Sequence, residues 1–362
     1  MSSSWGGPIR ISVFGESHGE AIGVVLDNLP AGEPIDPQEI MMQMERRSPG
    51  RSRSSTPRRE EDLPQVVSGL LHGKTTGTPL CALIRNKDTH SSDYDKIKSL
   101  PRPGHADYTG FVRYGGNADP RGGGHFSGRL TAPLTFAGAV CRQILSARGI
   151  EIGAHIASVA DVQDERFCPE EIPKELLLRL SRDPFALIDR KKEGPMLEKI
   201  EAARLARDSV GGTVECAAAG VPAGLGSPMF YGVENVLSSI LFGIPAVKGV
   251  EFGNGFGAAA RKGSENNDAF RMEDGQVKTA TNRCGGILGG ITTGMPLLLR
   301  AAFKPTPSIS QEQDTVNLES MENAKLIIQG RHDPCIVPRA VPVVEAAAAV
   351  GLLNLMAERG KL

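Results

Sequence analysis

Four of the seven histidines lie in polar loops beside glycine, where an imidazole can meet a ligand. They are His18 in GESHGE, His105 in RPGHADY, His125 in GGGHFSG and His332 in GRHDP. Glycine allows close backbone approach, and an imidazole with a pKa of about 6.5 suits proton transfer or phosphate contact. Any one of these histidines alone could equally have a structural, hydrogen-bonded role. The sequence contains no HxH or HExxH pattern, so no metal site is predicted.

The arginines gather in one segment. Residues 46–59 hold six arginines and no lysine or acid, while Glu45 precedes them and Glu60, Glu61 and Asp62 follow. Three interpretations are open: a solvated charge run, a nucleic-acid or nuclear-localisation patch, and an arginine cage for a small polyanion. The flanking acids weaken the interpretation as a polyelectrolyte tail. A guanidinium grips phosphate or carboxylate through two fixed N–H donors, which suits the cage.

Two further loops have the composition of anion sites. RGGGHFSGR at 121–129 places three glycines between arginines, and consecutive glycines can turn backbone N–H groups inward as an anion nest. The helix expected directly after them would point its N-terminus at the same place. KPTPS at 304–308 offers Lys304, Thr306 and Ser308, although simple turn chemistry would explain it equally well. Together the loops predict an enzyme with a phosphorylated, acidic ligand, but they do not specify a reaction.

The composition is that of an ordinary globular chain with an arginine bias. The 362 residues are 40% hydrophobic and 23% charged, with net charge −1, so no global field attracts nucleic acid or membrane. There are 27 Arg against 14 Lys. The N-terminus lacks a signal-peptide pattern, no run of about 18 uncharged apolar residues occurs, and no CxxC pair is present. We therefore expect a cytoplasmic protein without a membrane span.

The elements that must position these loops are expected to be of mixed type. Helices are predicted at 36–47, 128–148, 169–182, 195–208 and 340–359, and strands at 8–14, 22–27, 65–71, 79–85, 150–158, 213–220, 246–252 and within 285–303. Because strands and helices do not alternate strictly, an α+β fold is favoured over a doubly wound sheet.

Two segments need a separate interpretation. The stretch 87–127 is too long for an idle connection and is expected to be a functional loop. GNGFGA at 253–258 matches a dinucleotide-binding pattern, but the polar segment after it does not favour a helix, so a glycine-rich turn is expected.

Seven segments, in order, resemble motifs of the chorismate synthase family. They are GESHGEAIG (15–23), RRSPGRSRSSTPRRE (46–60), RPGHADYTG (102–110), RGGGHFSGR (121–129), GGILGGITTG (285–294), KPTPS (304–308) and GRHDPCIVPRAVPVVEA (330–346). The resemblance runs from near residue 8 to near residue 359. It implies one chorismate synthase-like domain over 1–362: an α+β sandwich with central helices between antiparallel β-sheets, long functional loops, and assembly as a homotetramer.

The resemblance also implies an activity. The family converts 5-enolpyruvylshikimate 3-phosphate into chorismate and phosphate, the last step of the shikimate pathway of aromatic amino-acid biosynthesis. This lyase reaction is an anti 1,4-elimination that removes the 3-phosphate and a C6 hydrogen, and it needs reduced FMN without net redox change. By resemblance, His18 would protonate the departing phosphate and His105 would supply or hold a proton near the flavin. Asp333 would help the flavin act as base toward the C6 hydrogen, with Ser127 nearby.

Binding residues carry over by the same resemblance. Flavin contacts are implied for His125, Phe126, Ser127, Pro245, Ala246, Gly289, Lys304, Pro305, Thr306, Pro307, Ser308 and Arg331. Substrate and NADPH-linked binding is implied for Arg47, Arg53 and Arg129, with Arg102, Arg331 and Arg339 completing the cage. This chain departs from many members, which have Arg in place of His125 and Asn in place of Pro245. A neutral imidazole cannot replace a permanent cation, and proline offers no backbone donor.

The expected partners follow from the same reasoning. No reductase domain is left over, so an external flavin reductase or other reductant is expected, with NADPH as an indirect reductant. Two rival classes stay open: a nucleic-acid binder using 46–59, and a flavin oxidoreductase with net hydride transfer. The first lacks aromatic residues for base stacking in that segment, and the second requires flavin to be consumed with each product formed.

Overall fold

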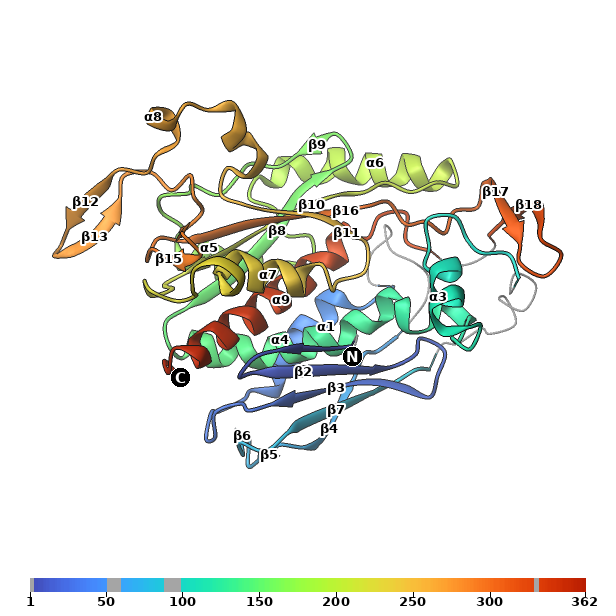
Figure 1. Ribbon diagram of the computed structural model, residues 1–362, viewed down its shortest axis with the longest axis horizontal. Coiled ribbons are helices and arrows are strands. Elements are labelled where there is room, and N and C mark those ends of the chain that lie inside the picture. Colours follow the sequence, from blue (N-terminus) through green and yellow to red (C-terminus); the bar gives the residue numbers. More distant parts are fainter. Residues whose placement is uncertain (1–2, 51–59, 88–98, 329–331) are drawn as a thin grey trace.

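Two antiparallel sheets enclose a layer of helices in the computed structural model, which describes residues 3–50, 60–87, 99–328 and 332–362 (Figure 1). The first sheet has the order β1 (Ser4–Gly6), β2 (Arg10–Gly15), β3 (Ala21–Asp27), β7 (Leu80–Arg85), β4 (Pro64–Ser68). In β3, Ile22, Val24 and Leu26 are fully buried because residues two apart share one face of a strand. The two predicted N-terminal strands are confirmed as the neighbours β2 and β3, so the loop carrying His18 leaves the end of this sheet.

The second sheet is also antiparallel. Its order is β11 (Val247–Phe252), β16 (Leu297–Phe303), β10 (Gly212–Ala219), β8 (Glu151–Val159), β9 (Val162–Gln163). GNGFGA follows β11 as the 3₁₀ turn η5 (Gly255–Ala260), and only the four-residue helix α8 (Gly263–Asn266) comes after it. Because β11 pairs antiparallel with β16, no parallel βαβ unit forms here, and the interpretation as a glycine-rich turn is confirmed.

Three helices form the layer between the sheets: α1 (Pro37–Arg47), α4 (Thr131–Ser146) and α9 (Val337–Glu358) (Figure 1). A Cβ on Gly138 of α4 would clash with Ala346 of α9, so glycine lets the two helix backbones pack in contact. Among the described helices α9 alone is long and apolar enough to cross a membrane, but 94% of its most apolar window is buried inside the protein. The predicted α+β sandwich with central helices is confirmed.

Helix α1 begins as the sequence predicts. The Asp36 side chain accepts a hydrogen bond from the Gln38 backbone N–H at 2.8 Å, and Pro37 occupies the first helical position. At the other end Arg46 donates to Glu345 of α9 at 2.5 Å, with both side chains buried. This ion pair ties α1 to α9.

The remaining elements lie outside this layer. The helices are α3 (Asp107–Tyr114), α5 (Lys174–Leu180), α6 (Glu193–Leu205) and α7 (Val233–Leu241). The short strand pairs are β5 (Leu70–Leu71) with β6 (Lys74–Thr75), β12 (Phe270–Glu273) with β13 (Gln276–Thr279), β14 (Ile287–Leu288) with β15 (Ile291–Thr292), and β17 (Glu312–Asn317) with β18 (Glu322–Ile327). Four 3₁₀ turns are η1 (Arg121–Phe126), η2 (Gly128–Leu130), η3 (Arg190–Lys192) and η4 (Met229–Tyr231).

Two predictions about these segments need correction. The stretch 87–127 is not loop throughout, because α3 forms inside it and ends at Gly115 in the left-handed conformation. The helix predicted at 169–182 starts only at Lys174, since Pro173 disfavours helical backbone in the residue before it.

A buried acid–base cluster lies in the second sheet, away from the cavity. His155 of β8 is within 2.8 Å of Asp164 through Nδ1 and 3.1 Å of Glu215 through Nε2, and its ring packs edge-on against Phe167. Burial lowers the pKa of His155, but the two carboxylates outweigh burial and raise it above its usual value. The cluster therefore stabilises the sheet in its charged form.

Candidate active site

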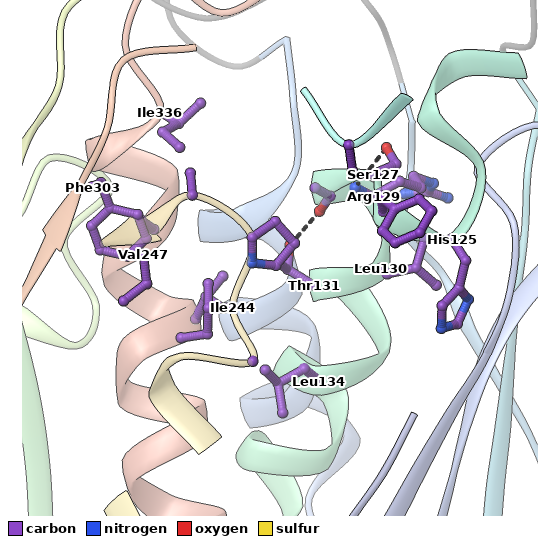
Figure 2. Close-up of a pocket in the computed structure, with 18 of the residues that line it drawn as sticks. His125, Ser127, Arg129, Leu130, Thr131, Leu134, Ile244, Val247, Phe303 and Ile336 are labelled. Atoms are coloured by element: carbon purple, nitrogen blue, oxygen red, sulfur yellow. Dashed lines mark hydrogen bonds between the residues drawn. The ribbon is translucent and has the colours of Figure 1, made fainter. Parts of the chain in front are cut away.

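A cavity of about 840 Å³ lies at the N-terminal ends of α4 and α9, between β2 of the first sheet and β11 and β16 of the second. It is near the upper end of the range of about 300–1,000 Å³ that is usual for small-molecule sites. Figure 2 shows its two sides, one apolar (Ile244, Val247, Phe303, Ile336) and one with polar groups (His125, Ser127, Arg129). Such a cavity suits a ligand with a flat apolar part and a charged part.

The three residues expected to be catalytic, His18, His105 and Asp333, all line this cavity. They come from the β2–β3 loop, the segment before α3 and the segment before α9, so the fold brings together residues more than 300 positions apart in the chain. Of the residues expected to bind, Arg47, Arg102, Arg129 and Arg339 also line it. Arg53 and Arg331 lie outside the described residues.

The triple glycine at 122–124 places the two histidines. All three glycines have positive φ, and a Cβ on Gly122 would clash with the His18 ring. A Cβ on Gly123 would come within 3.0 Å of Cε1 and Nε2 of His105. The glycines predicted as an anion nest therefore also provide the space in which both imidazoles lie against one backbone turn.

His105 is oriented by the carboxylate of Asp107, for which the sequence predicted no role. Its Nδ1 lies 2.6 Å from Asp107, and the same carboxylate accepts hydrogen bonds from Arg102 Nε at 2.7 Å and Nη2 at 2.8 Å. Burial raises the pKa of Asp107, but hydrogen bonds from Arg102 and His105 outweigh it and hold this pKa well below its usual range. The ionised carboxylate keeps the Nδ1 proton on His105, which leaves Nε2 to face a ligand.

A second buried carboxylate holds two of the cavity arginines. Asp62 accepts hydrogen bonds from Arg47, at 2.6 Å, and from Arg129. Burial raises the pKa of Asp62, yet the two guanidinium groups lower it to about 2. Burial lowers the pKa of Arg47 to about 10, so this side chain stays charged near neutral pH. In the sequence, Asp62 is marked only as one of the acids that follow the basic segment.

Asp62 and Asp107 bind the cavity arginines without lining the cavity themselves. Arg47, Arg102 and Arg129 line the cavity, whereas Asp62 and Asp107 do not. Guanidinium groups held in this way are already oriented when an anion arrives, so less conformational entropy is lost on binding. The interpretation of the basic segment as a cage for a small polyanion is supported for Arg47, and its residues 51–59 lie outside the described part of the chain.

Asp333 lines the cavity from the segment before α9. It forms an ion pair with Arg339, six residues later in α9, and Arg339 Nε also donates to the Arg47 carbonyl at 2.9 Å. The pair links α9 to the end of α1 and leaves both side chains part-buried at the cavity wall.

His125 is engaged by the protein through both ring nitrogens. Nδ1 lies 2.7 Å from the Gly15 carbonyl and must donate to it, so in the neutral ring Nε2 accepts from the Ser3 hydroxyl at 2.6 Å. The ring can therefore contact a ligand through its face without a new hydrogen bond. Phe126 packs against Tyr114 at 6.3 Å between ring centroids, and Ser127 accepts from the Arg129 backbone N–H at 3.2 Å.

The other expected flavin contacts divide between two places. Pro245, Ala246, Lys304, Thr306, Pro307 and Ser308 line the cavity. Lys304 Nζ donates to the Gly104 carbonyl and so ties the segment after β16 to the loop of His105. The hydroxyl of Thr306 is buried and has no hydrogen-bond partner within the described chain. Pro305 is not in the lining, and Gly289 lies in the turn between β14 and β15, outside it.

Sequence patterns gave no signal for much of the wall. Leu134, Ile244, Val247 and Phe303 are ordinary apolar residues whose place in the cavity follows only from the packing of α4 against the second sheet. The carboxylate of Asp107 could have been found, because it lies two residues after His105 in the same motif. Groups of three or more His, Cys, Asp or Glu able to hold a metal ion do not occur in the described ranges.

Comparison with known proteins agrees with this site. A family model described as Chorismate synthase matches residues 9–357. The chain belongs to the chorismate synthase family. A protein named chorismate synthase from Dehalococcoides mccartyi is 47% identical over 362 residues, covering 99% of this chain and 98% of that protein. One of the same name from Thermococcus gammatolerans is 49% identical over 351 residues, covering 97% and 96%.

A solved structure titled "Crystal Structure of Chorismate Synthase" superposes on this chain with a TM-score of 0.77 at 28% identity. The superposition covers 98% of this chain and 93% of that one. The chorismate synthase fold therefore extends over nearly all of this chain.

Proposed function

We propose that this member of the chorismate synthase family is a carbon–oxygen lyase that converts 5-enolpyruvylshikimate 3-phosphate into chorismate and phosphate. The observation that carries the proposal is the meeting of His18, His105 and Asp333 in one cavity whose surface presents oriented guanidinium groups. Family membership supports the same activity. The elimination separates a phosphate from C3 and a hydrogen from C6, so it needs an anion grip and proton carriers in one place.

The arginines would bind the anionic groups of the substrate. Arg47, Arg102 and Arg129 are each nearly buried and fixed by a carboxylate, which suits planar, bidentate recognition of carboxylate or phosphate. Their positive charge also stabilises the negative charge that accumulates on the departing phosphate. Arg53 and Arg331 would extend this set.

The residues present fit the flavin that the family requires. The unpartnered buried hydroxyl of Thr306 is the kind of orphan that a ligand satisfies, and Ser127 and Ser308 offer further hydroxyls at the same cavity. The apolar wall of Val247 and Phe303 gives a flat ring a surface to pack against. When bound, reduced FMN would supply an electron-rich ring that assists departure of the C6 hydrogen without net redox change.

The protons are then handled by three side chains. His18, with Ser17 Oγ 3.2 Å from its Nδ1, would donate a proton to the leaving phosphate. His105 would take up and hold a proton at Nε2, whose lone pair is available because Asp107 keeps the proton of the neutral ring on Nδ1. Asp333, held by its ion pair with Arg339, would orient and accept hydrogen bonds near the C6 hydrogen.

Several further features belong to the proposal. His125 would contact the flavin through its ring face, and Pro305 and Arg331 would complete the set of flavin contacts. NADPH would act only indirectly, through an external flavin reductase.

We also infer one domain over 1–362, a cytoplasmic location, and a homotetramer. The exposed aromatic side chains of Phe230 and Tyr231 in η4 support a subunit interface.

The test is an anaerobic assay of the purified protein with 5-enolpyruvylshikimate 3-phosphate and dithionite-reduced FMN. We expect chorismate to form in many turnovers per enzyme, and none to form with oxidised FMN. Absence of chorismate with every combination of reduced flavin and substrate would reject the activity.

A further inference from the structure

One polar group at the cavity has no role in the assignments above. The Nε2 atom of His332 is buried and has no hydrogen-bond partner within the described part of the chain, although His332 lines the cavity. Buried polar nitrogens are rarely left without a partner, and each exception calls for a water or ligand that satisfies it. Five buried polar atoms of the described residues have no hydrogen-bond partner, and only two of them, in Thr306 and His332, belong to residues that line the cavity. Of these two, His332 is the one next to the proton-carrying residues.

The surroundings of His332 hold its imidazole neutral. Burial disfavours its charged form first, and the positive charges of Arg102 and His105 add to this, while Asp333 opposes them; the pKa falls to about 4. Near neutral pH the ring is therefore one N–H donor and one lone pair. The neighbouring Arg102 already donates a hydrogen bond to Asp107, whereas Nε2 of His332 has no hydrogen-bond partner among the described residues.

We propose that His332 is a substrate-binding residue whose Nε2 donates a hydrogen bond to an anionic oxygen of the bound substrate, beside Arg102 and His105. The inference rests on the proposed function, because Arg102, whose charge acts on His332, is one of the guanidinium groups that the proposed function assigns to the anionic groups of the substrate. A donor that carries no charge adds an anion contact without adding repulsion to a pocket already lined by guanidinium groups.

This role predicts opposite effects of one substitution on stability and on binding. His332→Leu fills a similar volume but removes the orphan nitrogen, so the protein without ligand should keep or raise its melting temperature. The same change removes a hydrogen bond to a charged group, so affinity for substrate should fall roughly tenfold or more. His332→Gln retains a neutral N–H donor at nearly the same reach and should bind within about threefold of the unchanged protein.

The experiment is calorimetric titration of 5-enolpyruvylshikimate 3-phosphate into the protein loaded with oxidised FMN, which does not support turnover. FMN affinity is measured on the same three proteins and should agree within about twofold. A Leu variant that binds substrate as tightly as the unchanged protein overturns the inference, as does one that loses FMN instead or melts several degrees lower. If the unchanged protein forms no chorismate, the proposed function fails; if it forms chorismate and the Leu variant still binds normally, the His332 inference alone fails.

Discussion

The most informative single perturbation is Asp62→Asn, which removes the charge beneath the arginine cage and little else. Asp62 has a φ of 49°, a left-handed backbone that asparagine adopts readily, so the substitution adds no backbone strain. The amide has nearly the same shape as the carboxylate. What changes is that Arg47 and Arg129, both buried, lose the negative charge that they share.

The size of the effect follows from the pKa of Asp62. A tenfold change in an acid dissociation constant corresponds to about 1.4 kcal/mol, and the pKa falls from 3.8 to about 2, so ionised Asp62 stabilises the fold by roughly 2–3 kcal/mol. Leaving buried guanidinium groups uncompensated costs about 3–5 kcal/mol in comparable cases. We therefore expect Asp62→Asn to lower the free energy of unfolding by about 3 kcal/mol.

Urea denaturation at pH 7 measures this, with Glu61→Gln as the matched control. Glu61 pairs with Lys87, but both side chains are more than half exposed, so its substitution should change stability by less than about 1 kcal/mol. Because the pKa of Asp62 is depressed in the fold, its contribution is present above about pH 4 and is lost as the pH falls toward about 2; the Asn variant should lack this component. Equal stabilities for the Asn and Gln variants would refute the idea that Asp62 holds the cage.

Three further outcomes are expected. His18→Ala or His105→Ala should lower kcat at least about tenfold with FMN binding retained, and wild-type turnover in either would reject their assignment. Gly122→Ala places a Cβ against the His18 ring at a φ of 61° and should also lower kcat, whereas Gly194→Ala, at a glycine of α6 with open space around it and outside the cavity lining, should retain most activity. The melting temperature of the unchanged protein should fall as the pH rises through the raised pKa of His155. The reason is that protonated His155 stabilises the fold, and this stabilisation is complete only below the usual imidazole pKa of about 6.5. The melting temperature of a His155→Gln variant should depend less on pH, and parallel profiles for the two proteins would contradict this.

The local part of the architecture could be predicted because it depends on nearby residues. The helix predicted at 36–47 and the strands predicted at 8–14 and 22–27 each depend on residues a few positions apart, and these predictions are confirmed. The hairpins β12–β13 and β17–β18 escaped prediction, because β12 and β13 have only four residues each, β17 is mostly polar, and all four strands are largely exposed, so no long run of alternating apolar residues marks them in the sequence.

The sequence motifs predicted the histidines of the site, but not the buried groups whose roles depend on contacts in three dimensions. Glycine-flanked histidines gave His18 and His105, because that composition is unusual whatever the fold. Asp62 escaped assignment since its role depends on Arg129, which lies 67 positions away and meets it only in three dimensions. The orphan nitrogen of His332 likewise depends on burial, which no pattern along the chain reveals.

The measurement closest to the central claim counts product against flavin. Under anaerobic conditions, with a limiting amount of reduced FMN and excess 5-enolpyruvylshikimate 3-phosphate, chorismate and inorganic phosphate should appear in equal amounts and far exceed the flavin, which stays reduced at the end. One product per flavin, with the flavin oxidised in step, would instead show net hydride transfer and contradict an elimination in this cavity.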